Sequence, residues 1–276
     1  MAEAPLHIIT LVKWVPDAQL ERRFTEERRI DRSEGILGEL DEYPLEAACR
    51  IKEAEQERDD AREVRISVLT VGPSGATTAV KKALQIGADD AYHLSDDALV
   101  GTDVFGTSAA LRAAVEKILA VSELGEGQEP EYMVLTGMAS EDGESGATPA
   151  QLAERLGARL VSQAVSLELN EGRLVAVRAS AAEQQTVAVA LPAVISVTDQ
   201  ANDPRYPNFK AIMAAKKKPL TTWSLDDVGL PGSAVQPKVS VLTAEARPPR
   251  TSGEIITDEG DGGAKIVDFL AKERVL

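Results

Sequence analysis

The sequence has few of the residues that build disulfides, metal centres and catalytic acid–base groups. Cys49 is its single cysteine, which excludes an internal disulfide and a cysteine-based metal cluster and suits a reducing compartment. The two histidines, His7 and His93, each stand inside a strand-like run. So small a number argues against a histidine zinc site or a catalytic triad. We therefore expect no metal site.

Aromatic and basic residues are also scarce. Aromatics make up only 4% of the chain against 43% hydrophobic residues in all, so a core must consist mainly of Ala, Val, Leu and Ile. The 30 Lys and Arg residues are outnumbered by 45 Asp and Glu residues, which gives a formal net charge of −15. This charge argues against nucleic acid and anionic membrane surfaces as main partners.

Long apolar runs and targeting signals are missing as well. No stretch is long enough for a membrane-spanning helix, and the N-terminus has no signal-peptide pattern. We therefore expect a soluble chain without direct membrane insertion, located in the cytoplasm, or in the mitochondrial matrix if it comes from a eukaryote. Neither a P-loop nor a GxGxxG fingerprint is present, so neither motif identifies a nucleotide site.

Four strand-like runs, each followed by a helical pattern, organise the first half of the chain. They are Leu6–Trp14, Val64–Val71, Asp90–Leu94 and Tyr132–Thr136. This alternation predicts an α/β fold with a mostly parallel, doubly wound sheet covered by helices on both faces. Asp41 is the expected N-cap of the first helix.

The later strands are expected to be antiparallel in part. Residues 166–169 and 173–177 flank Asn170-Glu171-Gly172, a short loop whose glycine favours a hairpin. Residues 185–190 and 193–197 have the composition of further strands. The parallel sheet therefore acquires late antiparallel strands.

The rhythm of strands and helices is lost after residue 225, where prolines and glycines recur. We predict a strand at Val239–Leu242 and a final helix at Ala264–Arg274. The chain then divides into an α/β nucleotide-binding domain, residues 1–225, and an extended C-terminal arm, residues 226–276. Such an arm is too sparse for its own core, so it either wraps a partner subunit or is a disordered tail.

The loop after the fourth strand is the strongest candidate for a ligand site. Gly137, Gly143 and Gly146 are its flexible points, and Pro149 suits the first turn of the helix that follows. A strand, a glycine loop and a helix N-terminus together present backbone N–H groups to a phosphate. Every βα unit needs such a turn, however, so a loop without a ligand is equally open at this point.

A polar stretch at residues 198–209 leads into a short helix at Asn208–Lys217, with Phe209, Ile212 and Met213 on its apolar face. The helix ends in Lys216-Lys217-Lys218-Pro219. These lysines either oppose the helix dipole or form a basic patch for an acidic partner.

Several segments, taken in order, carry a family resemblance. The most specific lies between Leu191 and Pro219 and contains Asn202-Asp203-Pro204-Arg205-Tyr206-Pro207 and Ile212-Met213-Ala214-Ala215. Others are Val12-Lys13, Leu40-Asp41-Glu42-Tyr43, Leu135-Thr136-Gly137 and Pro248-Pro249-Arg250-Thr251-Ser252-Gly253. The chain resembles, over essentially its whole length, the beta subunit of an electron-transfer flavoprotein (ETF).

The resemblance implies an adenine nucleotide alpha hydrolase-like fold and a heterodimer with an ETF alpha subunit. In that family the alpha subunit carries the redox-active FAD, and the beta subunit holds a structural AMP. Electrons come from acyl-CoA dehydrogenases of fatty acid beta-oxidation, or related flavoenzymes, and pass to an ETF-quinone oxidoreductase. The chain would be an electron carrier subunit without catalytic residues of its own.

The resemblance also implies site residues at the ends of the first, second and fourth strands. The AMP contacts would be Leu11, Gly38, Glu39, Leu40, Asp41, Val71, Gly137, Met138, Ala139, Ser140, Asp142, Gly143, Glu144 and Ser145. Ala18 and Leu40 would lie near the FAD. A phosphate beside Glu141, Asp142 and Glu144 requires these side chains to turn outward, because like charges repel.

A loop that recognises the donor dehydrogenase would comprise Gln200, Ala201, Asn202, Asp203, Pro204, Arg205 and Tyr206. The family places an apolar anchor, often Leu or Ile, at position 201. Ala201 buries less area, so this contact would be weaker by roughly 1–2 kcal/mol.

Three alternatives remain beside an AMP-binding carrier subunit. Electron-bifurcating relatives hold a second FAD in place of AMP, with a longer loop after the fourth strand. An adenine-nucleotide hydrolase would need a Lys or a metal-binding carboxylate beside the glycine loop, and no Lys or Arg occurs between Gly137 and Ala153. A stand-alone nucleotide sensor would leave the arm unexplained.

Overall fold

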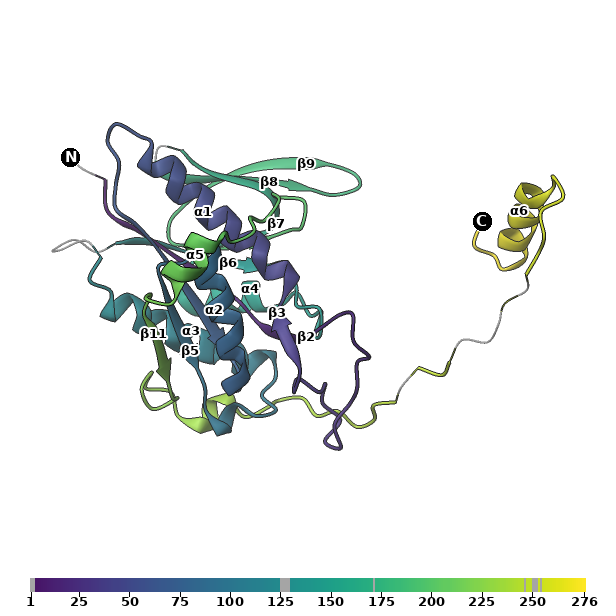
Figure 1. The fold of residues 1–276 in the computed structure, drawn as a ribbon, viewed down its shortest axis with the longest axis horizontal. Helices are drawn as coiled ribbons and strands as arrows, with labels where there is room; N and C mark the ends of the chain where they lie inside the picture. Colours follow the sequence, from purple (N-terminus) through teal and green to yellow (C-terminus); the bar gives the residue numbers. More distant parts are fainter. Residues whose placement is uncertain (1–2, 125–129, 171, 246, 250–252, 254) are drawn as a thin grey trace. The chain divides into compact units, whose positions relative to one another are not determined.

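The computed structural model describes residues 3–124, 130–170, 172–245, 247–249, 253 and 255–276 (Figure 1). The chain divides into two compact units, one ending at Leu242 and the other beginning at Thr243. The first unit is built on a nine-stranded sheet with the order β11-β5-β4-β1-β6-β10-β7-β8-β9. The second unit contains the helix α6, Gly262–Lys272, which agrees with the predicted C-terminal helix.

Seven neighbouring strands of the sheet are parallel. Apolar runs without alternation form its centre, because helices cover both of its faces. These strands are β1 (Leu6–Leu11), β4 (Val64–Val71), β5 (Asp90–Leu94), β6 (Glu131–Gly137), β7 (Arg159–Asn170), β10 (Ala193–Val197) and β11 (Leu220–Trp223). The predicted α/β class is confirmed, and the sheet is of the Rossmann-like, doubly wound type.

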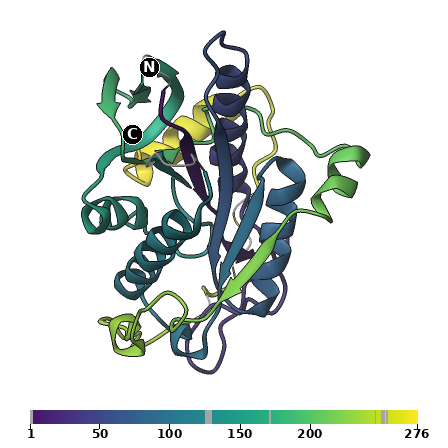
Figure 2. The same cartoon turned by 90° about the vertical axis from the view of Figure 1, so that its left-hand side faces the viewer.

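Two pairs of helices cover the two faces of the sheet and enclose separate apolar clusters (Figure 2). Strand side chains alternate between the faces, so Ile8 joins one cluster and Ile9 the other. The helices on the Ile8 face are α1 (Glu42–Gln56) and α2 (Thr77–Ile86). Those on the Ile9 face are α3 (Val104–Val121) and α4 (Thr148–Leu156).

The late antiparallel strands are confirmed, with one difference in extent. β8 (Arg173–Ala179) pairs antiparallel with the second half of β7 and with β9 (Gln184–Ala190). The predicted strand at residues 166–169 is only this second half. A register shift in β7, where Gln163 has a φ of 59°, separates it from the half that runs parallel to β10. Glu171 of the predicted hairpin loop lies outside the described residues.

The ends of two predicted strands differ from the structure. The first strand stops at Leu11, because β2 (Trp14–Pro16) leaves the main sheet and pairs with β3 (Gly35–Leu37) as an antiparallel ribbon. β11 was not predicted, although its sequence Leu-Thr-Thr-Trp is rich in strand formers. It directly follows the proline that was expected only to end a helix.

Residues 226–242 pack within the first unit. Val235 is fully buried, and its carbonyl accepts a hydrogen bond from Thr102 Oγ1 at 2.6 Å. The predicted strand at Val239–Leu242 is wrong, because the amides of Lys238 and Val239 donate to Asp103 Oδ2 and not to a neighbouring strand. The division at residue 225 and the wrapping of the arm around a partner stay predictions, and Arg250, Thr251 and Ser252 lie outside the described residues.

The short helix α5 (Phe209–Ala215) leaves two of its large apolar residues in solvent, while Ala215 is buried. Asn208 caps it as predicted, since its Oδ1 accepts the Ala211 amide at 2.9 Å. Phe209 is 79% exposed and Met213 is 44% exposed. No helix in the described part of the chain is both long and apolar enough to cross a membrane.

The Asp103 side chain caps α3 and also accepts the amides of Lys238 and Val239. Its replacement therefore tests the packing of residues 226–242. Its Oδ1 caps α3 by accepting the Phe105 and Gly106 amides, both at 3.0 Å. We expect Asp103→Ala to lower the free energy of unfolding by about 1–2 kcal/mol. Asp103→Asn should cost less, because it keeps the capping oxygen. Urea unfolding followed by tryptophan fluorescence measures both, and an alanine variant as stable as the wild type would contradict the expectation.

Candidate functional site

Three segments meet at the carboxyl edge of the parallel strands. They are the end of β1, the 3₁₀ turn Glu39–Asp41 and the loop after β6. The Gly38 amide donates to the Lys13 carbonyl at 3.0 Å, and the Leu40 amide donates to Glu141 Oε1 at 3.1 Å. The structure therefore brings together residues 38–41 and the loop after β6, two segments in which AMP contacts were predicted.

Glycines make this close approach possible. A Cβ atom on Gly137 would lie 2.7 Å from Asp41 Oδ1 and 2.8 Å from the Leu40 carbonyl oxygen. A Cβ atom on Gly38 would lie 2.9 Å from Glu141 Oε2. A side chain on Gly137 would push the turn away from the loop, because it would meet the Leu40 backbone, so this glycine is required by contact and not by backbone angle. At Gly38 the Glu141 carboxylate would have to move instead.

Asp41 is a positioning residue here. It was expected to cap α1, but its side chain makes no capping hydrogen bond and accepts the Lys13 amide at 2.7 Å instead. Burial is the main cause that raises the pKa of this carboxyl to about 8; the bond from the Lys13 amide opposes the shift, and the nearby charge of Glu141 adds to it. Asp41 thus ties the turn to the end of β1 in a largely protonated form at neutral pH.

Asp142 joins the loop to two cations from distant parts of the chain. Its Oδ1 lies 2.7 Å from Lys13 Nζ, and its Oδ2 accepts from Arg32 Nε at 2.8 Å. Lys13 Nζ also donates to Ser140 Oγ at 3.2 Å. Burial would raise the pKa of Asp142, but the two cations outweigh it and hold that pKa well below its usual range.

The expectation that Glu141, Asp142 and Glu144 turn outward is wrong for Glu141 and Asp142. The Asp142 side chain is fully buried, and Glu141 bonds to the Leu40 amide. Glu144 is exposed. The reason is that Lys13, Arg32 and a backbone N–H neutralise or bind the two inward carboxylates. Lys13 and Arg32 were missed as site residues, although the segment Val12-Lys13 was part of the family resemblance.

The remaining predicted contacts lie along the same edge. Leu11 and Val71 pack into the apolar cluster under α3 and α4, at the ends of β1 and β4. Met138 and Ala139 are half-buried, and Gly143 is exposed. Ser145 is exposed too, and its Oγ accepts the Ala147 amide at 3.4 Å. Near the expected flavin, Ala18 is exposed and Leu40 is half-buried.

The predicted docking loop, residues 200–206, is held by α1 through Arg205. The Arg205 guanidinium bonds to Glu46 Oε2 at 2.6 Å through Nε and to both carboxylate oxygens of Glu53, at 2.5 and 3.0 Å. Burial would raise the pKa of Glu46, but the bonds from Arg205 and Arg50 lower it. Asn202 adds a bond from its side-chain amide to the Tyr43 carbonyl, at 3.0 Å.

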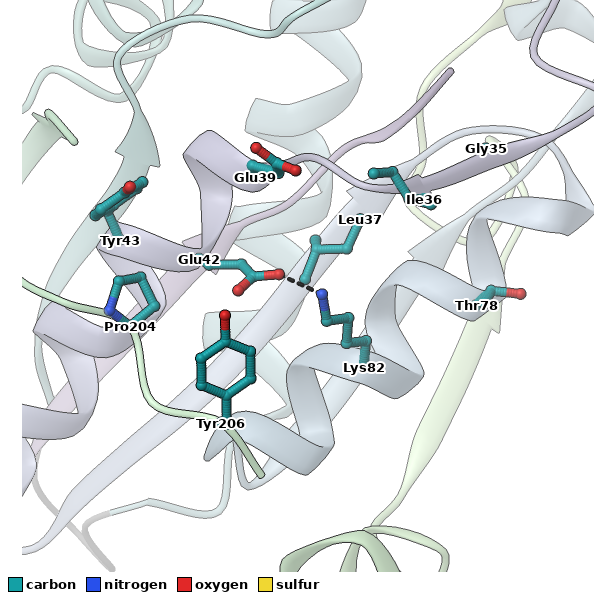
Figure 3. A pocket seen from close by; sticks show the side chains of 10 residues that line it. All are labelled: Gly35, Ile36, Leu37, Glu39, Glu42, Tyr43, Thr78, Lys82, Pro204 and Tyr206. Atoms are coloured by element: carbon teal, nitrogen blue, oxygen red, sulfur yellow. Dashed lines mark hydrogen bonds and ion pairs between the residues drawn. The ribbon is translucent and has the colours of Figure 1, made fainter. Parts of the chain in front are cut away.

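A cavity of about 450 Å³ lies between this loop, the segment from β3 to the start of α1, and helix α2 (Figure 3). Residues of β3, the 3₁₀ turn, α1, α2 and the loop line it. They are Gly35, Ile36, Leu37, Glu39, Glu42, Tyr43, Thr78, Lys82, Pro204 and Tyr206. This cavity was not predicted from the sequence, because its walls come from three stretches that are far apart in the chain, residues 35–43, 78–82 and 204–206. In the described residues no three His, Cys, Asp or Glu side chains cluster as a metal site would require.

Comparison with known proteins identifies the family. The sequence model of the electron transfer flavoprotein domain matches residues 29–228. The chain is 38% identical to the electron transfer flavoprotein subunit beta of Mycobacterium tuberculosis (strain ATCC 25618 / H37Rv), over 98% of this chain and 99% of that protein. The chain belongs to the beta subunits of electron transfer flavoproteins. This membership gives it a role in electron transfer.

Two further relatives share less of the sequence. The chain is 30% identical to the electron transfer flavoprotein subunit beta of Megasphaera elsdenii, with 98% of each protein covered. It is also 30% identical to subunit CarD of the caffeyl-CoA reductase-Etf complex of Acetobacterium woodii, over 91% of this chain and 92% of that protein. The relatives thus include proteins named as ETF beta subunits and one named as a subunit of a reductase-Etf complex.

Replacement of Gly137 tests the contact between the turn and the loop. The added methyl group of Gly137→Ala would lie too close to the Leu40 carbonyl, so we expect a loss of roughly 1–3 kcal/mol in the free energy of unfolding. Gly143→Ala is the matched control in the same loop, because its Cβ would meet Ser140 Oγ at 3.3 Å and no backbone atom. Urea unfolding compares the two, and equal stabilities would contradict the close approach.

Asp41 should make stability depend on pH in a defined direction. Its pKa is about 8 in the folded chain and has an ordinary value of 3.8 in the unfolded chain, so the native chain binds the additional proton between these values. The stabilisation is complete below the lower value and is lost as pH rises through the upper one, with a slope of at most about 1.4 kcal/mol per pH unit. Asp41→Asn can still accept the Lys13 amide and has no such proton. Urea unfolding between about pH 5 and 8 should therefore give a flatter profile for the variant than for the wild type; identical slopes would disprove the assignment.

Proposed function

We propose that this chain is the non-catalytic subunit of a cytoplasmic heterodimer with an ETF alpha subunit. The alpha subunit would hold the FAD that carries electrons. Acyl-CoA dehydrogenases or related flavoenzymes would supply these electrons, and an ETF-quinone oxidoreductase would receive them. The observation that carries the proposal is near full-length similarity to named beta subunits together with a preformed junction at the carboxyl edge of the sheet.

The residues at this junction fit an adenine nucleotide with a structural role. AMP would lie along the ends of β1, β4 and β6, where open parallel sheets bind ligands. Gly38 and Gly137 permit close approach of the backbone, and Lys13 and Arg32 bring positive charge to the loop. The Ser145 hydroxyl and backbone amides of residues 138–145 would hold the phosphate, apart from the amides of Gly143 and Glu144, which donate to Ser140. When bound, AMP would supply packing and charge, and no redox chemistry.

Docking of the donor would use the loop at residues 200–206. Loops are mobile by default, and the Arg205 bonds to Glu46 and Glu53 fix this one on a helix that packs against the sheet. The C-terminal arm would wrap the alpha subunit. In support of this, no residue of α6 is buried, and Ile266, Val267 and Phe269 are more than half exposed.

A second FAD in place of AMP is the alternative that an observation favours. The similarity to CarD connects the chain to a reductase complex. In that case the loop at residues 137–145 would belong to an electron-splitting redox site. Bound nucleotide therefore distinguishes the two functions.

The first experiment is co-expression with the alpha subunit, followed by acid extraction and chromatography of the bound nucleotides. One FAD and one AMP in each heterodimer are expected. Two FAD molecules would overturn the AMP assignment in favour of electron splitting. A stable isolated chain that hydrolyses ATP would overturn the carrier function altogether.

A variant at Lys13 tests the cation beside the loop. In the proposed complex Lys13, which pairs with Asp142, also donates a charge-assisted hydrogen bond to the phosphate. Lys13→Met removes that bond, typically about 1.5–3 kcal/mol, so the complex should retain AMP roughly ten- to a hundredfold less tightly while its FAD content stays unchanged. Lys81→Met, at an exposed position of α2, is the control. Circular dichroism confirms that both variants fold. Full AMP occupancy in dialysed Lys13→Met would contradict this position for the phosphate.

A further inference from the structure

An exposed aromatic ring stands at the mouth of the cavity beside the docking loop. Tyr206 is 95% exposed, and with Pro204 it forms the loop side of the cavity. Figure 3 shows its hydroxyl end facing Glu42 and Lys82 across the cavity. A tyrosine with nearly its whole ring in solvent buries little area on folding. Nearly all of the surface of the ring is therefore available to a partner.

The middle of the docking loop offers little apolar surface to a partner. Ala201 is half-buried, and its methyl group packs against the apolar cluster under α1 and α2. It therefore contributes little surface to a partner. Tyr206 is the large exposed side chain within the same loop. A partner that binds this loop would therefore bury most surface at Tyr206, at the mouth of the cavity.

The cavity is also electronegative. Glu39 and Glu42 line it, and Lys82 forms an ion pair with Glu42. Among the described residues Glu39 has no ion-pair partner, so its charge is not neutralised. The cavity thus combines an uncompensated carboxylate with an exposed ring.

The field of this region acts on Tyr43, a further lining residue. Burial is the main cause that raises the pKa of Tyr43, and four carboxylates add to it: Asp199, Glu39, Asp203 and Glu42. These carboxylates come from both sides of the cavity. A negative potential over a concave surface attracts a cationic partner group.

We propose that this cavity receives an arginine side chain of the donor flavoenzyme, with the guanidinium on the Glu39 carboxylate and stacked on the ring of Tyr206. The inference rests on the proposed docking function of this chain. Arginine fits better than lysine, because its planar guanidinium pairs with a carboxylate through two bonds and stacks on aromatic rings. Glu39 adjoins Leu40, the residue expected near the flavin. Docking at this cavity would therefore bring the donor close to its acceptor.

The test measures electron transfer from an acyl-CoA dehydrogenase, reduced by its acyl-CoA substrate, to the complete alpha–beta complex. Glu39→Gln and Tyr206→Ala should each lower kcat/KM about five- to thirtyfold through KM, with kcat unchanged at saturating donor. The AMP content of both complexes should equal that of the wild type, which separates donor docking from the AMP contact expected at Glu39. Tyr206→Phe keeps the ring and should stay near the wild-type value. Glu39→Arg should lose about a hundredfold, because like charges then oppose each other.

Glu154→Gln is the matched control, since it removes the same charge from an exposed position of α4 on the other face of the sheet. Glu39→Gln should flatten the dependence of kcat/KM on ionic strength more than this control does. Equal kinetics of the Glu39→Gln and Glu154→Gln complexes would overturn the proposal. Both positions are exposed, so loss of folding is not expected to obscure the result.

A second measurement tests the cavity without any donor enzyme. The complex, with ring-labelled tyrosine, is titrated with N-acetylarginine amide and with its neutral citrulline analogue. Saturable chemical-shift changes at Tyr206 are expected with the arginine compound alone, and Glu39→Gln should remove them. If the wild-type complex takes no electrons from the dehydrogenase but shows these shifts, the donor class is wrong and the cavity assignment stands. No arginine-dependent shift would overturn the cavity assignment.

Discussion

The buried carboxyl group of Asp41 fixes the edge of the sheet on which the candidate nucleotide site is built. It accepts the Lys13 amide, so the turn before α1 lies against the end of β1. Gly137 provides the opposite surface, because any side chain there would collide with the same carboxyl. An ionised group at this depth is costly, and burial therefore raises its pKa until the neutral acid prevails. The site thus depends on a buried carboxyl group that is largely protonated at neutral pH.

Helix α1 connects this edge with the proposed docking surface. Its first residue, Glu42, lines the cavity, and further along the helix Glu46 and Glu53 hold Arg205 of the loop. Leu45 is fully buried beneath, so the helix itself is fixed on the sheet. A buried Glu46 without cations would be unfavourable, which makes the loop conformation and the packing of the helix mutually dependent. An irregular segment gains a defined position in this way.

The sequence predicted elements well where local pattern decides, and poorly where distant residues decide. β4, β5 and β10 begin and end where their apolar runs do. β11 was missed because four residues carry little periodicity, and its strand character comes from pairing with β5. In the site, the glycine loop was recognisable from spacing. Its cations were not, because Lys13 and Arg32 reach Asp142 across more than a hundred residues of sequence.

The pairing of Asp142 with Lys13 and Arg32 changes the net charge of the acidic loop. A phosphate approaching a loop with Glu141, Asp142 and Glu144 would be repelled if these charges faced it. Asp142 is instead paired with two cations, which leaves one net positive charge among the three groups. The lack of a basic residue between Gly137 and Ala153 therefore says nothing against a phosphate here. It does not favour hydrolysis either, because both cations are already paired with the buried Asp142 carboxylate.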